Sequence, residues 1–211
     1  SASHLKDRTV QVIPNAGKDI IFRNTKEKKD AIRTALGLPL GKPILLFIAN
    51  AFSDPVKGSE TVARLLRDER LSAMQFVAIG NGSFPAYPNL KQISYTRDAS
   101  LLAQYYSAAD IFIHPATVDN FPTVIIESLL SGTPVVAYRI GGIPEQIQGG
   151  TTGALATPYV YEEFVSGILS LNSQKHNSAE ISAEAHARFS AHAMTEAYLR
   201  VYEELLSPPS A

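Results

Sequence analysis

The sequence predicts an α/β domain with a doubly wound, mainly parallel sheet and helices on both faces. Two observations support this fold class. Short apolar segments of strand length alternate with segments of helical spacing over most of the 211 residues, an order typical of βαβ units. Some of the apolar segments, such as KPILLFIAN at residues 42–50, contain almost no polar residue, as expected of strands that are covered on both faces.

Strands are expected where apolar residues run on or alternate and then stop at Gly, Pro or Asn. In chain order these segments are residues 9–15, 42–50, 75–82, 90–95, 110–116, 133–142 and, as a small strand or turn, 151–158. The first, TVQVIPN, alternates and stops at Pro14 and Asn15. A polar connector is expected after it, over residues 15–29.

Helices are expected where apolar residues recur at three- and four-residue spacing. The segments are residues 28–38, 53–68 (a loop and then a helix), 99–109, 121–132, 143–148 and a helical tail from residue 159. Gly37 and Gly132 are usual helix ends, and Pro122 suits a first turn. Ser190 can cap the last helix. One face of that helix carries Met194, Ala197, Tyr198, Val201 and Leu205.

The composition excludes several classes of protein. A formal net charge of −1, from 19 basic and 20 acidic residues, gives no sign of a nucleic-acid partner. The absence of cysteine excludes disulfide scaffolds, thiolate metal sites and cysteine nucleophiles. No apolar run approaches 18 residues and the N-terminus lacks a signal-peptide core, so we expect a cytoplasmic protein. Because the chain starts without Met, we expect a fragment or a processed form.

Neither histidines nor carboxylates suggest a metal site. His4, His176, His186 and His192 lack metal-ligand spacing with carboxylates, and no Asp-x-Asp pair occurs, so we expect no metal cofactor. His114 ends an expected strand beside the candidate site described next. There it either contacts a ligand or is a packed or solvent-facing histidine.

The segment DNFPTVIIESLLSGTPVV, residues 119–136, holds the candidate site. Ligands of such sheets bind outside the carboxyl ends of the strands, and this segment lies in the loop after one of them. A helix that begins at Phe121 leaves its first N–H groups free, which suits a phosphate. Asp119 and Glu127, eight positions apart, can accept hydrogen bonds from the hydroxyl groups of a ribose or a sugar. The segment therefore favours a ligand with both phosphate and hydroxyl groups.

A purely structural interpretation of this segment stays open. In that interpretation Asp119 or Asn120 only caps the helix, and Glu127 lies on a solvated face. Spacing alone does not decide between the two interpretations.

The segment DNFPTVIIESLLSGTPVVAYRIGGIPEQI, residues 119–147, resembles the donor-binding segment of the retaining glycosyltransferases of family 4. The family is marked by Glu, seven residues and a second Glu, then a small-Gly-Thr-Pro-Val-Val run and a Gly-Gly-x-Pro-Glu loop. The sequence has the run, the loop and the second Glu, as Glu127, whereas Asp119 replaces the first Glu. The resemblance implies a Rossmann-like domain that forms one half of a two-domain GT-B architecture.

Further segments extend the resemblance over about residues 10–206. They are VIPNAGKDIIF, similar to the family's hinge, ILLFIANAFSDPVKG and YYSAADIFIHPA, similar to two of its strands, and RFSAHAMTEAYLRVYEEL, similar to its closing helix. The resemblance implies that residues 1–211 form a single nucleotide-sugar binding domain with its core at about residues 10–206. We expect an N-terminal acceptor domain to precede residue 1 in the full-length protein.

The resemblance also implies roles for individual residues. Glu127 would hold the ribose hydroxyls, Asp119 would face the hydroxyls of the transferred sugar, and Tyr95 would border the base. Lys57 would stabilise the charge that develops on the leaving diphosphate, so Asp119 and Lys57 are the expected catalytic residues. The free amides of residues 121–124, which exclude Pro122 because it has no N–H, would contact the diphosphate or the sugar. The other expected substrate-binding residues are Asn120, Phe121, Pro122, Thr123 and Val124.

One departure from the family concerns the diphosphate. Many members carry an Arg a few residues before the Lys, but the sequence here reads NAFSDPVKG, residues 50–58. Either Lys57 acts alone or another group, such as Arg139, replaces the Arg. A surface role for Arg139 is the alternative.

The expected function is transfer of a sugar from a nucleotide diphosphate sugar to an acceptor hydroxyl with retention, in bacterial polysaccharide or glycan synthesis. The acceptor would be an unknown glycan or lipid-linked molecule, and the full-length protein would act at the inner face of the membrane. The isolated domain should be inactive. The alternative is a non-catalytic nucleotide-sugar binding module of the same fold. A dinucleotide-binding oxidoreductase is disfavoured, because IANAFSD stands where G-x-G-x-x-G should follow the first strand.

Overall fold

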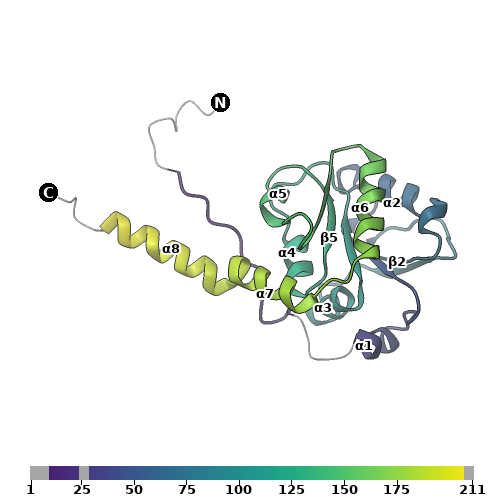
Figure 1. Cartoon of the computed structure of the whole chain (residues 1–211), viewed down its shortest axis with the longest axis horizontal. Coiled ribbons are helices and arrows are strands. Elements are labelled where there is room, and N and C mark those ends of the chain that lie inside the picture. The colour runs from purple at the N-terminus through teal and green to yellow at the C-terminus, as the bar shows by residue number, and fades with distance from the viewer. Residues whose placement is uncertain (1–9, 24–28, 207–211) are drawn as a thin grey trace.

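The computed structural model describes residues 10–23 and 29–206, and within them it contains a six-stranded, wholly parallel sheet (Figure 1). The strands are β1 (Ile44–Ala51), β2 (Gln75–Asn81), β3 (Leu90–Ser94), β4 (Ile111–His114), β5 (Val135–Tyr138) and β6 (Gly153–Ala156). Their order is β3-β2-β1-β4-β5-β6. The order reverses between β1 and β4, and sheets of this type bind ligands beside such a reversal, at the carboxyl ends of the strands.

Helices connect the strands in nearly every case, as the alternating pattern predicts. They are α1 (Lys29–Ala35), α2 (Ser59–Leu65), α3 (Ala99–Ala108), α4 (Thr123–Leu130), α5 (Ile143–Gln146), α6 (Tyr161–Ser173), α7 (Ser178–Phe189) and α8 (Ala191–Leu206). Two short 3₁₀ helices, η2 (Pro55–Lys57) and η3 (Glu69–Leu71), precede and follow α2.

Side chains alternate along each strand between two hydrophobic cores, one on each face of the sheet. Leu46 and Phe112 belong to the core that α1, α3, α4 and α7 cover. Leu45 and Ile113 belong to the core that α2 and α6 cover. The prediction of a doubly wound sheet with helices on both faces is therefore confirmed.

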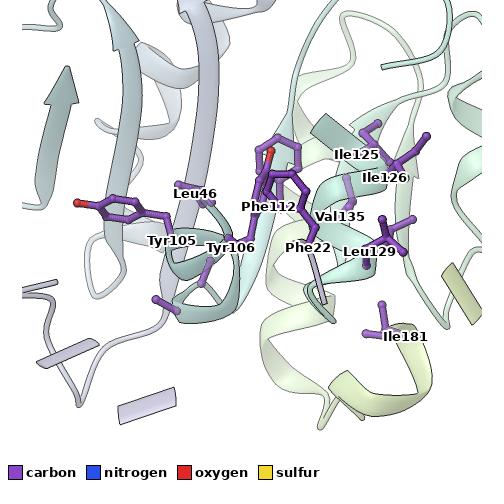
Figure 2. Close-up of a cluster of buried hydrophobic side chains, with 14 of the residues drawn as sticks. Phe22, Leu46, Tyr105, Tyr106, Phe112, Ile125, Ile126, Leu129, Val135 and Ile181 are labelled. Carbon is purple, nitrogen blue, oxygen red and sulfur yellow. The ribbon is translucent and has the colours of Figure 1, made fainter. Parts of the chain in front are cut away.

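An aromatic cluster of Phe22, Tyr106 and Phe112 lies in the first core beside α4 (Figure 2). The Tyr106 ring packs edge-on against both neighbours, with ring centroids 5.8 Å from Phe22 and 5.4 Å from Phe112. Such pairs stabilise a core beyond the area that they bury. Phe22 comes from the expected polar connector, Tyr106 from α3 and Phe112 from β4. The cluster therefore joins three distant segments and fixes the place of Tyr106.

The expected strand at residues 9–15 is wrong over its described part, residues 10–15, which form neither strand nor helix. Val10 and Val12 are 62% and 72% exposed, so these alternating apolar residues cover no sheet in the described part of the chain. A strand needs a neighbour for its backbone hydrogen bonds. Thr9, like residues 24–28 of the expected connector, lies outside the described residues.

The last helix, α8, forms as expected, but its apolar face is not buried. Ser190 caps the helix, since its Oγ accepts a hydrogen bond from the Ala193 N–H at 3.1 Å. Tyr198 and Leu205 are nevertheless 45% and 76% exposed, and Figure 1 shows α8 extending away from the sheet. Within residues 10–23 and 29–206, none of the helices combines the length and apolar character needed to span a membrane.

The loop after β5 is closely packed against the loop that precedes α4. The Gly142 N–H donates to the Asn120 carbonyl at 2.6 Å. Gly141 has a φ of +48°, and a Cβ at this position would overlap the backbone oxygen of Asp119. Only a glycine combines this φ with so close an approach at little cost. The two loops therefore hold each other in place.

Replacement of Gly141 should reveal the cost of disturbing this contact. We expect Gly141→Ala to lower the free energy of unfolding by about 1–3 kcal/mol, because the new Cβ is strained and meets backbone. Urea unfolding of the purified chain measures the change. Gly149→Ala is the matched control, since a Cβ there meets no atom within 4 Å. Equal stabilities of the two variants would contradict the prediction.

Candidate functional site

A cleft lies at the carboxyl edge of the sheet beside the N-terminus of α4. It consists of two cavities of about 360 Å³ and about 280 Å³. Both are lined by Ile48 and Asn50 from the end of β1 and by Thr123 and Val124 from the first turn of α4. Since they share these residues, the cavities are neighbouring parts of one site at the reversal of strand order.

The larger cavity, which we call the Glu127 cavity, brings together residues from distant parts of the chain. Glu127 comes from α4, Tyr95 and Arg97 come from the loop after β3, and Lys18 comes from the segment before α1. Tyr95 is 37% exposed at the cavity, as expected of a residue that could border a planar ring. The Lys18 and Arg97 side chains add positive charge, and neither was singled out from the sequence.

Glu127 faces this cavity because of its place on α4. It lies four residues after Thr123 and so shares a helix face with it, whereas Ile126 and Ser128 on either side are fully buried. The Tyr106 hydroxyl donates a hydrogen bond to Glu127 Oε2 at 3.1 Å. Burial raises the pKa of Glu127 to about 7, although the Tyr106 hydrogen bond and the Lys18 charge act in the opposite direction. Glu127 therefore does not lie on a solvated face.

The smaller cavity, which we call the Asp119 cavity, contains a charged cluster. Lys57 Nζ donates to Asp119 Oδ2 at 3.2 Å. His114 Nε2 lies 3.5 Å from the same oxygen, but the pair falls short of hydrogen-bond geometry. The contacts with His114 and Lys57 hold the pKa of Asp119 below its usual value, against the effect of burial. Asp119 is therefore a carboxylate near neutral pH.

Local backbone structure carries Lys57 to this cavity. Lys57 ends the 3₁₀ helix η2, which Asp54 caps by accepting a hydrogen bond from the Val56 N–H at 3.1 Å. Gly58 follows with a φ of +80°, and a Cβ there would overlap the Pro115 carbonyl. The Lys-Gly pair thus lets the loop after β1 approach the loop after β4, which supplies Asp119.

The N-terminus of α4 opens into both cavities. The expected start at Phe121 is corrected to Thr123, with Pro122 at the N-cap and no side-chain cap. The Ile125 N–H returns to the Pro122 carbonyl at 3.3 Å, whereas the N–H groups of Thr123 and Val124 donate to no described residue. Neither Asp119 nor Asn120 caps the helix, so the interpretation of these two residues as helix caps is wrong. Two unused amides at a helix N-terminus attract an anion.

Not all residues singled out from the sequence line the cleft. Tyr95, Thr123, Val124 and Glu127 line the larger cavity, while Lys57, Asp119, Pro122, Thr123 and Val124 line the smaller one. Asn120 and Phe121 line neither cavity. The Phe121 ring packs edge-on against Phe189 at 6.2 Å. Arg139 is exposed at the end of β5 and lines neither cavity.

Two buried residues that support the site were missed in the sequence. Gln146 Nε2 donates to the Pro122 carbonyl at 3.0 Å and so holds the N-terminus of α4. Tyr106 holds Glu127, as described above. The available signal was the pattern of a Tyr inside an apolar helix face, because a buried Tyr hydroxyl usually finds a hydrogen-bond partner.

A cavity at the opposite edge of the sheet offers no comparable chemistry. Its volume is about 400 Å³, and it is lined by Lys29, Arg33 and Asp110, among others. These charges already pair with one another, with Arg33 Nη2 2.6 Å and Lys29 Nζ 3.1 Å from the Asp110 carboxylate. In the described part of the chain, no group of three or more His, Asp or Glu side chains is placed to hold a metal ion.

Glu127 should make the stability of the fold depend on pH. Its pKa is higher in the folded chain than the ordinary value of 4.5, so the folded state binds more protons between about pH 4.5 and about pH 7. We therefore expect the free energy of unfolding to fall by about 3 kcal/mol as the pH rises through this range. Glu127→Gln should remove this fall, and urea unfolding at several pH values measures both proteins. Parallel pH profiles would contradict the prediction.

Removal of the Tyr106 hydroxyl should raise the pKa of Glu127 further. The hydrogen bond from Tyr106 stabilises the charged carboxylate, so Tyr106→Phe should move the midpoint above about 7. A carbon-detected NMR titration of the Glu127 carboxyl measures the midpoint. Tyr105→Phe is the matched control, because the Tyr105 hydroxyl points away from α4 (Figure 2). An unchanged midpoint in Tyr106→Phe would refute the role of this hydrogen bond.

Comparison with known proteins identifies a family to which the chain is similar. The model of the family "Glycosyl transferases group 1" matches residues 28–188. The chain is 30% identical to D-inositol 3-phosphate glycosyltransferase 2 of Catenulispora acidiphila, over 90% of the chain and 51% of that protein. It is 26% identical to D-inositol 3-phosphate glycosyltransferase of Corynebacterium diphtheriae, over 93% of the chain and 50% of that protein. The chain spans about half the length of these relatives.

Solved structures share the fold. Sucrose-phosphate synthase from Thermosynechococcus elongatus superposes with a TM-score of 0.77 at 23% identity, over 96% of the chain and 55% of that protein. HepE from Anabaena, in complex with UDP-glucose, superposes with a TM-score of 0.70 at 20% identity, over 92% and 57%. The described fold corresponds to the C-terminal half of a GT-B enzyme. On the family match over most of its length, the chain belongs to the group 1 glycosyl transferases, the retaining family 4 enzymes.

Proposed function

We propose that this chain binds a nucleotide diphosphate sugar, with UDP as the nucleotide, and is the donor half of a retaining glycosyltransferase. The observation that carries the proposal is the order of the functional groups along the cleft. Glu127 and the Lys57–Asp119 pair lie in adjoining cavities, and the unused amides of Thr123 and Val124 lie between them. A nucleotide sugar needs groups in this same order: a hydrogen-bond acceptor for the ribose hydroxyls, an anion-binding site for the diphosphate and a hydrogen-bond acceptor for the sugar hydroxyls.

The nucleoside half of the donor fits the Glu127 cavity. The Glu127 carboxyl, held by Tyr106, can accept hydrogen bonds from the ribose hydroxyls, and Tyr95 can border the base. Lys18 and Arg97 add positive charge beside the nucleotide. UDP is the nucleotide of choice for a test because the similar HepE has been solved with UDP-glucose.

The diphosphate and the sugar fit the second half of the cleft. Among the described residues that line the Asp119 cavity, Lys57 is the only Lys or Arg, and it can stabilise the charge that develops on the leaving diphosphate. The amides of Thr123 and Val124 add a helix dipole of favourable sign. Asp119 can accept hydrogen bonds from the sugar hydroxyls.

The reaction in this proposal is the attack of an acceptor hydroxyl on the sugar with retention of configuration. Another domain would bind the acceptor, so the 211 residues alone should bind the donor and transfer little sugar. A glycan or lipid-linked acceptor, a role in polysaccharide synthesis and action at the inner face of a membrane remain hypotheses from the sequence.

A non-catalytic nucleotide-sugar binding module is the second candidate. Two observations favour it: Asp119 stands in place of the usual Glu, and Lys57 is paired with Asp119. The arrangement still leaves a cation and a carboxylate at the sugar end of the cleft, which favours the catalytic proposal. Transfer activity of the full-length protein, lost on Asp119→Ala, would separate the two candidates.

Calorimetric titration of the purified chain tests donor binding. We expect UDP-glucose and UDP to bind, and we expect Glu127→Ala to weaken both by about tenfold or more, because a hydrogen-bonded carboxylate is lost. Lys57→Met should weaken UDP more than uridine, since uridine carries no phosphate. Glu196→Ala on the exposed α8 is the control and should bind like the unmodified chain.

Three results would contradict the proposal. The first is no binding of any nucleotide sugar by the chain. The second is full affinity in Glu127→Ala. The third is an equal loss for UDP and uridine in Lys57→Met, which would place the lysine away from the diphosphate.

A further inference from the structure

His114 is a buried polar side chain that faces the sugar end of the cleft. Its side chain is only 4% exposed, yet it lines the Asp119 cavity. Its Nε2 has no hydrogen-bond partner within the described residues. A buried nitrogen without a partner costs free energy, so such a group in a cleft points to a contact that forms when the cleft is occupied.

The contacts of Asp119 converge on one of its two oxygens. Both Lys57 Nζ, at 3.2 Å, and His114 Nε2, at 3.5 Å, approach Oδ2. Oδ1 accepts no hydrogen bond from a described residue. One oxygen of the carboxylate is therefore tied to the protein, and the other is free to accept a hydroxyl.

In the proposed function, Lys57 can pair with either of two anions, the Asp119 carboxylate or the diphosphate of the donor. Without a ligand it neutralises Asp119. A diphosphate bound at the N-terminus of α4 would compete with Asp119 for the same ammonium group. If Lys57 turned to the diphosphate, Asp119 would keep a half-buried charge without a partner, unless a second donor took over.

We propose that His114 is that second donor: a positioning residue whose Nε2–H bonds Asp119 Oδ2 when Lys57 turns to a diphosphate. The proposal rests on the proposed function for the identity of the diphosphate. The bond requires the two atoms to approach by about 0.5 Å, since N–H···O bonds are about 3.0 Å long. Asp119 would then keep its orientation, with Oδ1 toward the hydroxyls of the sugar.

The surroundings of His114 suit this role. Its ring stacks on the Phe112 ring, with centroids 6.2 Å apart and planes at 28°, so the imidazole cannot swing freely. Burial lowers the pKa of His114, although Asp119 opposes this effect. A neutral imidazole that carries its proton on Nε2 donates one hydrogen bond, and it adds no second cation that would compete with Lys57 for the carboxylate.

The first test needs no nucleotide. Lys57→Met imitates the departure of the ammonium group from Asp119. We expect His114 Nε2 in this variant to carry a proton that is hydrogen-bonded and protected from exchange with water, in long-range ¹H–¹⁵N NMR spectra. An unprotonated Nε2, or a proton that exchanges as fast as that of the exposed His192, would overturn the proposal.

The second test measures the binding of UDP-glucose by calorimetry. His114→Phe keeps the ring shape but removes the donor, and we expect it to weaken binding by at least about tenfold. His114→Gln keeps an N–H at a similar reach and should restore affinity to within about threefold. In the Asp119→Asn background, His114→Phe should change affinity by less than about twofold, because His114 acts through Asp119.

Controls separate this role from a loss of folding. His176→Gln, at the opposite edge of the sheet, should leave binding unchanged, and thermal unfolding of each variant checks its stability. Equal losses from His114→Phe with and without Asp119→Asn would overturn the proposal, as would full affinity in His114→Phe. If the unmodified chain binds no nucleotide sugar, the proposed function fails, while the NMR test still decides the role of His114.

Discussion

The burial of α4 against the sheet is the constraint on which the whole site depends. A helix of eight residues is too short to be stable by itself, so its place is set by packing. Ile125, Ile126 and Leu129 are almost completely buried in the core that holds the aromatic cluster (Figure 2). With that face fixed, Thr123 and Glu127 must face the cleft, and the amides of the first turn must open into it.

The cleft holds its two carboxyl groups in opposite electrostatic states. Burial dominates at Glu127 and raises its pKa to about 7, whereas the contacts of Asp119 with His114 and Lys57 hold its pKa low. Each state is set by neighbours from other segments, since Tyr106 comes from α3 and Lys57 from the loop after β1. Near neutral pH Glu127 is therefore partly protonated, whereas Asp119 is ionised and paired with Lys57. This division suits a donor with a ribose at one end and a leaving diphosphate near the other.

The sequence predicted the parallel sheet and its two layers of helices, because strand and helix periodicities alternate clearly and local patterns suffice for them. It failed where an outcome depends on distant partners. Residues 10–15 alternate like a strand but pair with no strand in the described part of the chain, and the apolar face of α8 is only partly covered by described residues. The family resemblance pointed to Lys57 and Asp119 separately, but it predicted neither their contact nor the roles of Tyr106 and Gln146, which follow from packing between segments far apart in the chain.

A titration of the ¹⁵N-labelled chain with UDP-glucose, followed by amide NMR shifts, tests the central claim most directly. The donor cleft predicts the largest changes at the N–H groups of Thr123 and Val124, with smaller changes at Ile48 and Asn50, which line the same two cavities. Unchanged amides at the N-terminus of α4, together with shifts around Arg33 at the opposite edge of the sheet, would contradict the account.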